Sequence, residues 1–226
     1  MDSKALHDAF REEVRDTQQP YLWLSSEIYR YADDAQKMFC RLQGGIADAS
    51  SSLTQVSASA GALFGDISSR ILKIRYASRA SDDTEVEILN FEDMQSMRVS
   101  DDYGYYARTR LDNSTGSILS IVVGMESNRV RFSPIPEAAE TINLIVYRMP
   151  LEDITGSGID LEIDEQHHEY LLLWMKHRAY CKQDAETYDK GKAAEFEFRF
   201  REYCRQAREE REKREHKYRT VAYGGY

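Results

Sequence analysis

The sequence predicts an α+β fold, in which N- and C-terminal helices form a bundle, an antiparallel β lobe is inserted between them, and an arm extends from the C-terminus. Apolar residues recur three and four apart near both ends of the chain, which is the spacing of amphipathic helices. In the middle of the chain, apolar and polar residues instead alternate, and β-branched residues are frequent. Because helical stripes cannot be buried one at a time, the early and late helices are expected to pack together, with the strands as a separate lobe.

Two helices are predicted near the N-terminus. The first covers residues 4–15. The second begins with Ser25 as its capping residue, with Leu24 expected to pack on Tyr29 as a hydrophobic staple, and it ends at Gly44. The apolar stripe of this second helix comprises Ile28, Tyr31, Ala32, Ala35, Met38, Phe39 and Leu42.

The middle of the chain is predicted to be β-rich. Strands are expected over residues 55–59, 71–77, 85–89, 104–111, 118–125, 130–132 and 141–147, with a short helical turn over 91–99. Pro134 and Pro136 end the strand before them, because proline cannot donate to a ladder. Since the last three strands follow one another by short connections, they are expected to be antiparallel neighbours.

Helices are predicted again from residue 160 onwards. One covers 165–182, with Asp164 as its cap and Tyr170, Leu171, Trp174, Met175, Arg178 and Cys181 at helical spacing, and another covers 189–217. The end of the last helix is charged in mixed sign, which is typical of a solvated surface held by pairs four residues apart. The predicted organisation is a helical bundle of 1–47 and 160–217, an inserted β lobe of 48–159, and a flexible arm of 218–226.

Charge and composition exclude several classes of protein. A net charge of −9 argues against general nucleic-acid binding, although an acidic wall suits a channel past which DNA slides. No apolar run approaches the roughly 20 residues that span a membrane, and the charged N-terminus is not a signal peptide. Cys40, Cys181 and Cys204 have no CxxC spacing and are interpreted as reduced, packed thiols, which suits a cytosol.

The sequence contains no recognisable catalytic constellation. It has no glycine-rich phosphate loop, no GxSxG and no HExxH. His167, His168 and His177 lack the spacing of a zinc-binding helix and are interpreted as solvated or interface histidines. Asp33 and Asp34 lie at the edge of an amphipathic helix and are interpreted as surface acids. The sequence therefore predicts no catalytic residue, no cofactor and no metal.

Fifteen tyrosines are many for this length, and three of them fall in the C-terminal "YRTVAYGGY". Tyrosine is enriched at protein interfaces because it joins a large apolar face to a hydrogen-bonding tip. An aromatic tail that follows a charged helix is therefore expected to dock onto another chain, with glycines that let the backbone turn. The expected contact residues are Tyr218, Val221, Tyr223, Gly224, Gly225 and Tyr226.

Three segments together resemble the adaptor, or head-to-tail connector, proteins of tailed bacteriophages, especially the short-tailed ones. They are "LWLSSEIYRYADDAQKMFCR", "RVRFSPIPEAAETINLIVYRMPLEDI" and "HHEYLLLWMKHRAYCKQDAETYDKGKAAEFEFRF". The resembling features are a Trp-Ser-acid start of a helix, a strand leading to "P.P", a strand ending in "R.P", and two helices flanking a "D.ET.D..KA" turn. The chain departs from the family pattern at "WLSS" and in its long Ser/Ala loop.

The resemblance implies a structural virion protein with no enzyme activity. It implies a ring of twelve copies bound beneath the portal, which prolongs the DNA channel, offers a platform to the tail nozzle or tail fibre proteins, and lets DNA pass at ejection without binding it specifically. The implied location is the neck or tail of the virion, with assembly in the host cytoplasm and no membrane contact. Two alternatives are another neck or tail completion protein of the virion and a soluble α+β enzyme.

Overall fold

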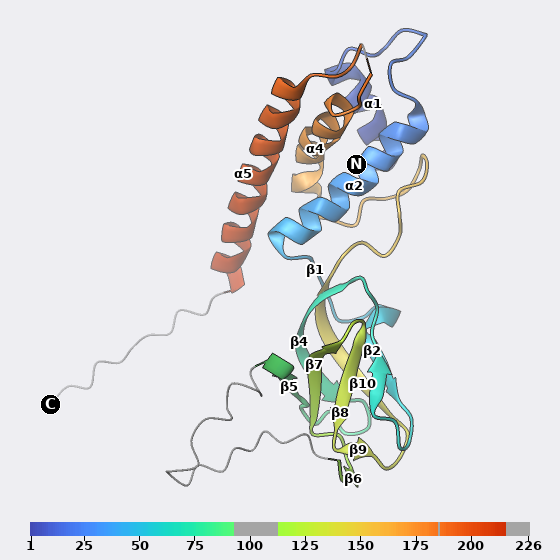
Figure 1. Ribbon diagram of the computed structural model, residues 1–226, viewed down its shortest axis with the longest axis vertical. Coiled ribbons are helices and arrows are strands. Elements are labelled where there is room, and N and C mark those ends of the chain that lie inside the picture. The colour runs from blue at the N-terminus through green and yellow to red at the C-terminus, as the bar shows by residue number, and fades with distance from the viewer. Residues whose placement is uncertain (93–112, 185, 216–226) are drawn as a thin grey trace, which may run out of the picture. The chain divides into compact units, whose positions relative to one another are not determined.

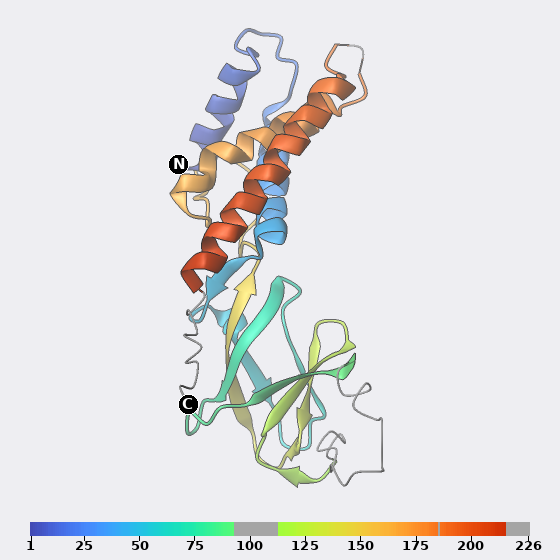
Figure 2. The same cartoon turned by 90° about the vertical axis from the view of Figure 1, so that its left-hand side faces the viewer.

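The computed structural model describes residues 1–92, 113–184 and 186–215, and its chain divides into two compact units. The helical unit comprises residues 1–45 and 150–226, and the β unit comprises residues 46–149. The elements of each unit can be followed in Figures 1 and 2. The predicted α+β class is confirmed. The predicted strand over 104–111 and most of the predicted turn over 91–99 lie outside the described residues.

The helical unit is organised around α4. Its elements are α1 (Ser3–Glu13), α2 (Ser25–Gln43), the short 3-10 helix η3 (Glu165–His167), α4 (His168–Tyr180) and α5 (Lys190–Glu215). Helix α4 packs against α1, α2 and α5, and Figure 1 shows it between α2 and α5. Because α4 has neighbours on several sides, it is buried on more than one face, through Leu171, Leu172, Trp174, Met175 and Ala179.

This surrounding of α4 corrects the predicted stripe at three positions. Tyr170, Arg178 and Cys181 were grouped with the buried residues by spacing, but all three are exposed. Cys40 and Cys204 are buried, as predicted, and burial raises the pKa of the Cys204 thiol to about 12. A helix buried on several faces has no single apolar stripe, so its outward residues could not be identified from spacing.

The start of α2 differs from the prediction. Leu24, not Ser25, is the capping residue, and Ser25 is the first residue of the helix. Leu24 is 65% exposed, so it forms no hydrophobic staple with Tyr29. The first turn is instead stabilised from inside the helix, because the Glu27 carboxylate accepts a hydrogen bond of 2.9 Å from the Leu24 backbone N–H. The predicted end is confirmed, since Gly44 adopts the left-handed conformation with φ of 102°.

Over its described residues, 46–92 and 113–149, the β unit contains two four-stranded sheets and one two-stranded sheet. In the first sheet, β10 (Glu140–Arg148) pairs along one edge with β1 (Ile46–Asp48) and β2 (Gln55–Ala58), and along the other with β4 (Ile71–Arg79). The second has the order β3 (Phe64–Asp66), β8 (Arg129–Ser133), β7 (Ser120–Glu126) and β5 (Glu87–Asn90). The small sheet joins β6 (Thr115–Gly116) to β9 (Ile135–Pro136).

Both four-stranded sheets contribute to one apolar core. Val56, Ala77 and Ile142 come from the first sheet, whereas Ile121 and Phe132 come from the second. Gly65 on β3 shows how close this packing is, because a Cβ at that position would lie 2.5 Å from Phe132 and 2.7 Å from Val56. Glycine is therefore required there by space.

The pairing of the strands also corrects the prediction. Strands β7 and β8 are antiparallel neighbours, as predicted, but β10 lies in the other sheet. Two pairs are parallel, β5 with β7 and β6 with β9, in a unit that was predicted to be antiparallel throughout. Strand β8 ends at Ser133, directly before Pro134 as predicted, but Pro136 does not end a strand, because it lies in β9 opposite Gly116. The chain then enters the first sheet, where β10 buries Ile142, Leu144 and Val146.

Candidate interaction surfaces

Trp23, in the segment that carries the family resemblance, lies at a junction of helices. Its side chain is 2% exposed, and its ring packs edge-on against Phe10 of α1 at 5.7 Å and Tyr180 of α4 at 6.1 Å. The indole N–H donates to the backbone oxygen of Ala179 at 3.4 Å. The tryptophan therefore ties the loop before α2 to two other helices, which is a structural role rather than a binding role.

A buried ion pair supports the same loop. The Arg11 guanidinium donates to the Asp16 carboxylate at 2.7 Å and to the Trp23 backbone oxygen at 3.0 Å. Asp16 also accepts from the backbone N–H groups of Leu22 and Trp23. These partners satisfy both charges. Sequence reasoning missed this pair, because one arginine and one aspartate among many charged residues carry no periodic signal.

The acid of the Trp-Ser-acid motif and the turn between α4 and α5 are structural as well. Glu27 accepts from Lys182 at 3.2 Å, which connects the start of α2 to the end of α4. Asp184 accepts from the backbone N–H groups of Glu186 and Thr187, at 2.9 and 3.0 Å. Asp189 accepts from the Lys192 N–H at 3.0 Å and so caps α5. These hydrogen bonds explain why a turn of this kind uses acids.

The arginine of the "R.P" motif forms a buried ion pair inside the β unit. Arg148 on β10 donates to Asp48 on β1, and each residue is 8% exposed. Burial alone would raise the pKa of Asp48, but hydrogen bonds from Ser51 and the Ser50 N–H, together with Arg148, hold that pKa well below its usual range. The pair fixes β1 beside β10, where Ile46 lies opposite Arg148.

The two acids of α2 that were interpreted as surface groups are tethers. Asp33 accepts from the Ile154 backbone N–H at 3.0 Å and from Lys37 at 2.7 Å. Asp34 accepts from the Trp174 indole N–H at 2.8 Å. Both acids therefore hold segments that are far away in the sequence against α2. Asp34, with its side chain 37% exposed, is at the surface as interpreted, whereas Asp33 is only 19% exposed.

The three histidines each contact another part of the helical unit. His167 lies 2.8 Å from the Tyr203 hydroxyl, His168 lies 2.8 Å from the Ile163 backbone oxygen, and His177 lies 2.9 Å from the Ala193 backbone oxygen. Burial lowers the pKa of His167 and raises that of Tyr203 to about 12. His167 and His168 are buried rather than solvated, which corrects their interpretation.

The outward face of α5 carries a ladder of charges. Its i,i+4 ion pairs include Arg201 with Glu197 at 2.8 Å and Arg208 with Glu212 at 2.9 Å, as the mixed-sign pattern predicted. Phe198 stands on this helix with its side chain 70% exposed. The charged end is not wholly solvated, however. Arg211 donates to the Gln43 side chain at 2.9 Å and to the Gly45 backbone oxygen at 3.0 Å, at the end of α2.

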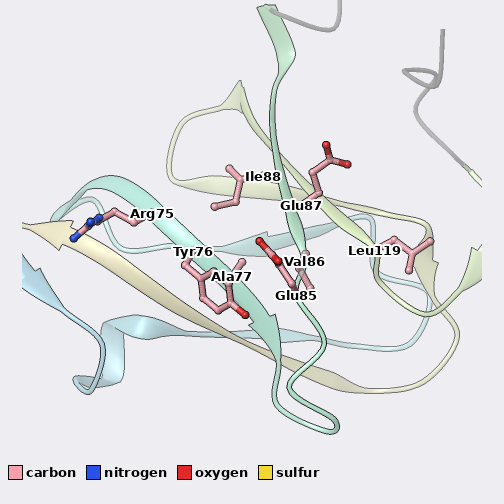
Figure 3. Close-up of a pocket in the computed structure, with 8 residues that line it drawn as sticks. All are labelled: Arg75, Tyr76, Ala77, Glu85, Val86, Glu87, Ile88 and Leu119. Atoms are coloured by element: carbon pink, nitrogen blue, oxygen red, sulfur yellow. The ribbon is translucent and has the colours of Figure 1, made fainter. Parts of the chain in front are cut away.

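The β unit contains an open pocket of about 450 Å³, which we call the β4–β5 pocket (Figure 3). Beside the isolated bridge between Ser78 and Glu85, the Val86 N–H donates to the Ala77 oxygen at 2.8 Å. From there β5 continues along β7 instead of β4. The pocket is lined by Arg75, Tyr76, Ala77, Glu85, Val86, Glu87, Ile88 and Leu119. The periodicity of the sequence does not indicate this pocket. Its lining residues come from β4, from β5 and the residues just before it, and from Leu119 just before β7, and these segments are far apart in the sequence.

The predicted contact residues Tyr218, Val221, Tyr223, Gly224, Gly225 and Tyr226 lie outside the described residues. Within residues 1–92, 113–184 and 186–215, no group of three or more His, Cys, Asp or Glu could hold a metal ion. In the same part of the chain, no helix has the length and apolarity needed to cross a membrane. The described surfaces thus offer a pocket, a charged helix face and exposed aromatic side chains.

The family model described as SU10 adaptor protein matches residues 1–222. No curated protein matches the chain. The family match spans both the helical unit and the β unit and extends into the predicted C-terminal arm.

Proposed function

The chain belongs to the SU10 adaptor protein family, a family of bacteriophage adaptors, and we propose that it forms a ring of twelve copies that joins the capsid portal to the tail and prolongs the DNA channel. The family match over residues 1–222 carries this proposal. As a phage adaptor, the chain is a structural component of the virion, of a family that is not normally enzymatic and that associates with portal and tail components.

The charge of the chain supports a channel through which DNA passes. At −9 per copy, the assembled copies repel a polyanion rather than hold it. The same charge makes the copies repel one another at low salt. We therefore propose that the free chain is a monomer and that the ring forms on the portal, whose contacts offset the repulsion.

Sedimentation tests the proposed ring. The free 26.2 kDa chain is expected to sediment as a monomer at moderate salt, and to co-sediment with purified portal at one adaptor per portal subunit. A stable ring without portal would contradict templating while leaving the adaptor role intact. Absence of the chain from portal complexes and from purified particles would contradict the adaptor role itself.

We further propose that the arm carries an assembly contact. Tyr218, Val221, Tyr223, Gly224, Gly225 and Tyr226 dock in grooves of a neighbouring subunit or of the portal. A chain that ends after Lys217 retains every described helix, since α5 ends at Glu215. It is expected to show unchanged circular dichroism and to fail to join DNA-filled heads. Infectious particles at the normal yield from this shortened chain would exclude a role of the arm in assembly.

A further inference from the structure

We propose that the β4–β5 pocket receives the C-terminal tail, residues 216–226, of a second copy of the chain. This inference rests on the proposed ring, because it assigns the contact through which neighbouring copies hold one another. The pocket and the tail are complementary in charge and in apolar character.

The rim of the pocket is acidic. Glu85 and Glu87 are both exposed, and neither forms an ion pair within the described part of the chain. Arg75 also lines the pocket, but its guanidinium lies over the Tyr147 ring at 4.8 Å, and Figure 3 shows it pointing away from both glutamates. The two carboxylates therefore favour a basic occupant.

The tail is the basic part of an acidic protein. Residues 216–226 contain Lys217 and Arg219 and no Asp or Glu, whereas the whole chain has a net charge of −9. Its other residues include three tyrosines, a threonine and a valine, which favour an extended conformation beside other strands. In such a conformation Arg219, Val221 and Tyr223 point to the same side.

The pocket offers apolar surface for that side of the tail. Leu119 is 59% exposed, and the half-buried Tyr76 and Ile88 line the pocket with it. An exposed leucine beside two carboxylates suits a segment that alternates basic and apolar groups. Aromatic side chains supply large contact areas with few rotatable bonds, so the tail tyrosines can bind with a small loss of entropy.

The backbone leaves room for an added segment. Tyr76 lies opposite Ile145 and Ile74 lies opposite Val146, so Arg75 is an extra residue that forms a β-bulge in β4. The bulge bends β4 where β5 leaves it to pair with β7. An extended peptide can use the strand edges exposed at such a point for main-chain hydrogen bonds.

A second copy, rather than the chain's own tail, is proposed because of symmetry. A contact between two different surfaces, here tail and pocket, repeats head to tail, and it gives a ring when the rotation between successive copies closes, as in the proposed ring of twelve. Each copy then offers one tail and one pocket, and no copy is left unsatisfied.

Disulfide trapping in assembled particles tests the proposal. All chains carry Cys181→Ser, because Cys181 is the exposed native thiol. One tagged variant carries Leu119→Cys and a second, with a different tag, carries Val221→Cys, and particles are assembled from an equal mixture. Leu63→Cys replaces Leu119→Cys in the control, since Leu63 is an exposed leucine of the same unit, at 42%, that does not line the pocket. A chain with both Leu119→Cys and Val221→Cys reports on its own tail.

The expected result is a disulfide between the two tagged chains and none with the Leu63→Cys control. Glu87→Lys is expected to slow the formation of this disulfide about two- to fivefold, which is the effect of losing one exposed ion pair. Arg219→Glu in the partner chain is expected to restore the rate, because it recreates the pair with the charges exchanged. A disulfide that forms only within the doubly substituted chain, or only with the portal, would overturn the proposal. Particles that contain the chain but no such disulfide would overturn it as well. Absence of the wild-type chain from particles would instead refute the proposed function.

Discussion

The helical unit and the β unit are stabilised in different ways. In the helical unit, polar side chains join segments that are far apart in the sequence, as Asp34 does with Trp174 at 2.8 Å. In the β unit, two sheets share an apolar core, and a buried ion pair of Asp48 with Arg148 fixes one edge strand. A bundle of helices with exposed ends needs such ties to set its register, whereas a sheet is already registered by its backbone pairing.

The difference shows what the motifs of the family resemblance do. Trp23, Glu27 and Asp184 all make contacts inside the helical unit, and Arg148 makes one inside the β unit. Trp23 and Arg148 are buried, and Glu27 and Asp184 accept hydrogen bonds from within the unit. These motif residues therefore help to specify the two folded units.

The largest expected effect tests the aromatic packing of the helical unit. Phe39 is 1% exposed and lies 4.8 Å from the His167 ring. Phe39→Asp buries an unpaired charge and removes this packing, so we expect a loss of more than about 4 kcal/mol in the free energy of unfolding. Phe198→Asp is the matched control, because Phe198 is 70% exposed. This control is expected to change the free energy of unfolding by less than about 0.5 kcal/mol. A wild-type melting temperature for Phe39→Asp would refute the bundle packing.

The buried pair of the β unit gives the next largest effect. Asp48→Asn removes the buried carboxylate that pairs with Arg148 across β1 and β10, which is expected to lower the free energy of unfolding by about 3–5 kcal/mol at neutral pH. Because the pKa of Asp48 is depressed in the folded state, its stabilisation is present above the unfolded-state pKa of about 3.9 and is lost as the pH falls below it. The variant is therefore expected to lose this acid dependence, and Asp66→Asn, at an acid 88% exposed, is the control.

The same variant tests whether the two units are independent. Both tryptophans, Trp23 and Trp174, belong to the helical unit, so their fluorescence reports on that unit. Asp48→Asn is expected to accelerate hydrogen exchange in β1 and β10 without moving the fluorescence transition. Equal shifts in both measurements would mean that the units unfold together.

The elements that the sequence predicted are those whose signals are local. Most of the predicted stripe of α2 is buried as expected, at Ile28, Tyr31, Ala32, Ala35 and Phe39. Met38 and Leu42, which were predicted with them, are only half-buried. Helix α4 was located, but its burial on several faces hid which side chains point outward, as for Tyr170. Pro134 predicted where β8 ends, but not that β10 belongs to the other sheet, because that choice depends on where β10 buries its apolar side chains.

The candidate surfaces divide in the same way. The i,i+4 pairs of α5 follow from spacing alone and were predicted. The β4–β5 pocket requires two strands to separate beside a third, and no periodicity indicates that. The contact role of the tail remains a prediction, because Tyr218 and the residues after it lie outside the described residues.

A smaller effect tests how closely the two sheets of the β unit pack. Gly65→Ala places a methyl group against Phe132 and Val56, where both neighbours belong to the core, so a loss of about 1–3 kcal/mol is expected. Gly156→Ala in the helical unit is the control, because a Cβ there meets no atom within 4 Å. Urea denaturation of both variants measures the difference. Equal stability of the two variants would mean that the core of the β unit yields to accommodate the methyl group.

The smallest expected effect concerns two arginines of α5 that are one turn apart. Arg211 reaches Gln43 and Gly45 at the end of α2, and its side chain is 20% exposed. Arg208 pairs with Glu212 on its own helix and is 57% exposed. Arg211→Ala is therefore expected to cost about 1 kcal/mol in urea denaturation followed by tryptophan fluorescence. Arg208→Ala is expected to cost about 0.3 kcal/mol, because exposed pairs on one helix contribute little. If the two variants lose the same stability, the charged end of α5 is held by its own pairs alone. The hydrogen bonds of Arg211 to the end of α2 would then add no stability to the helical unit.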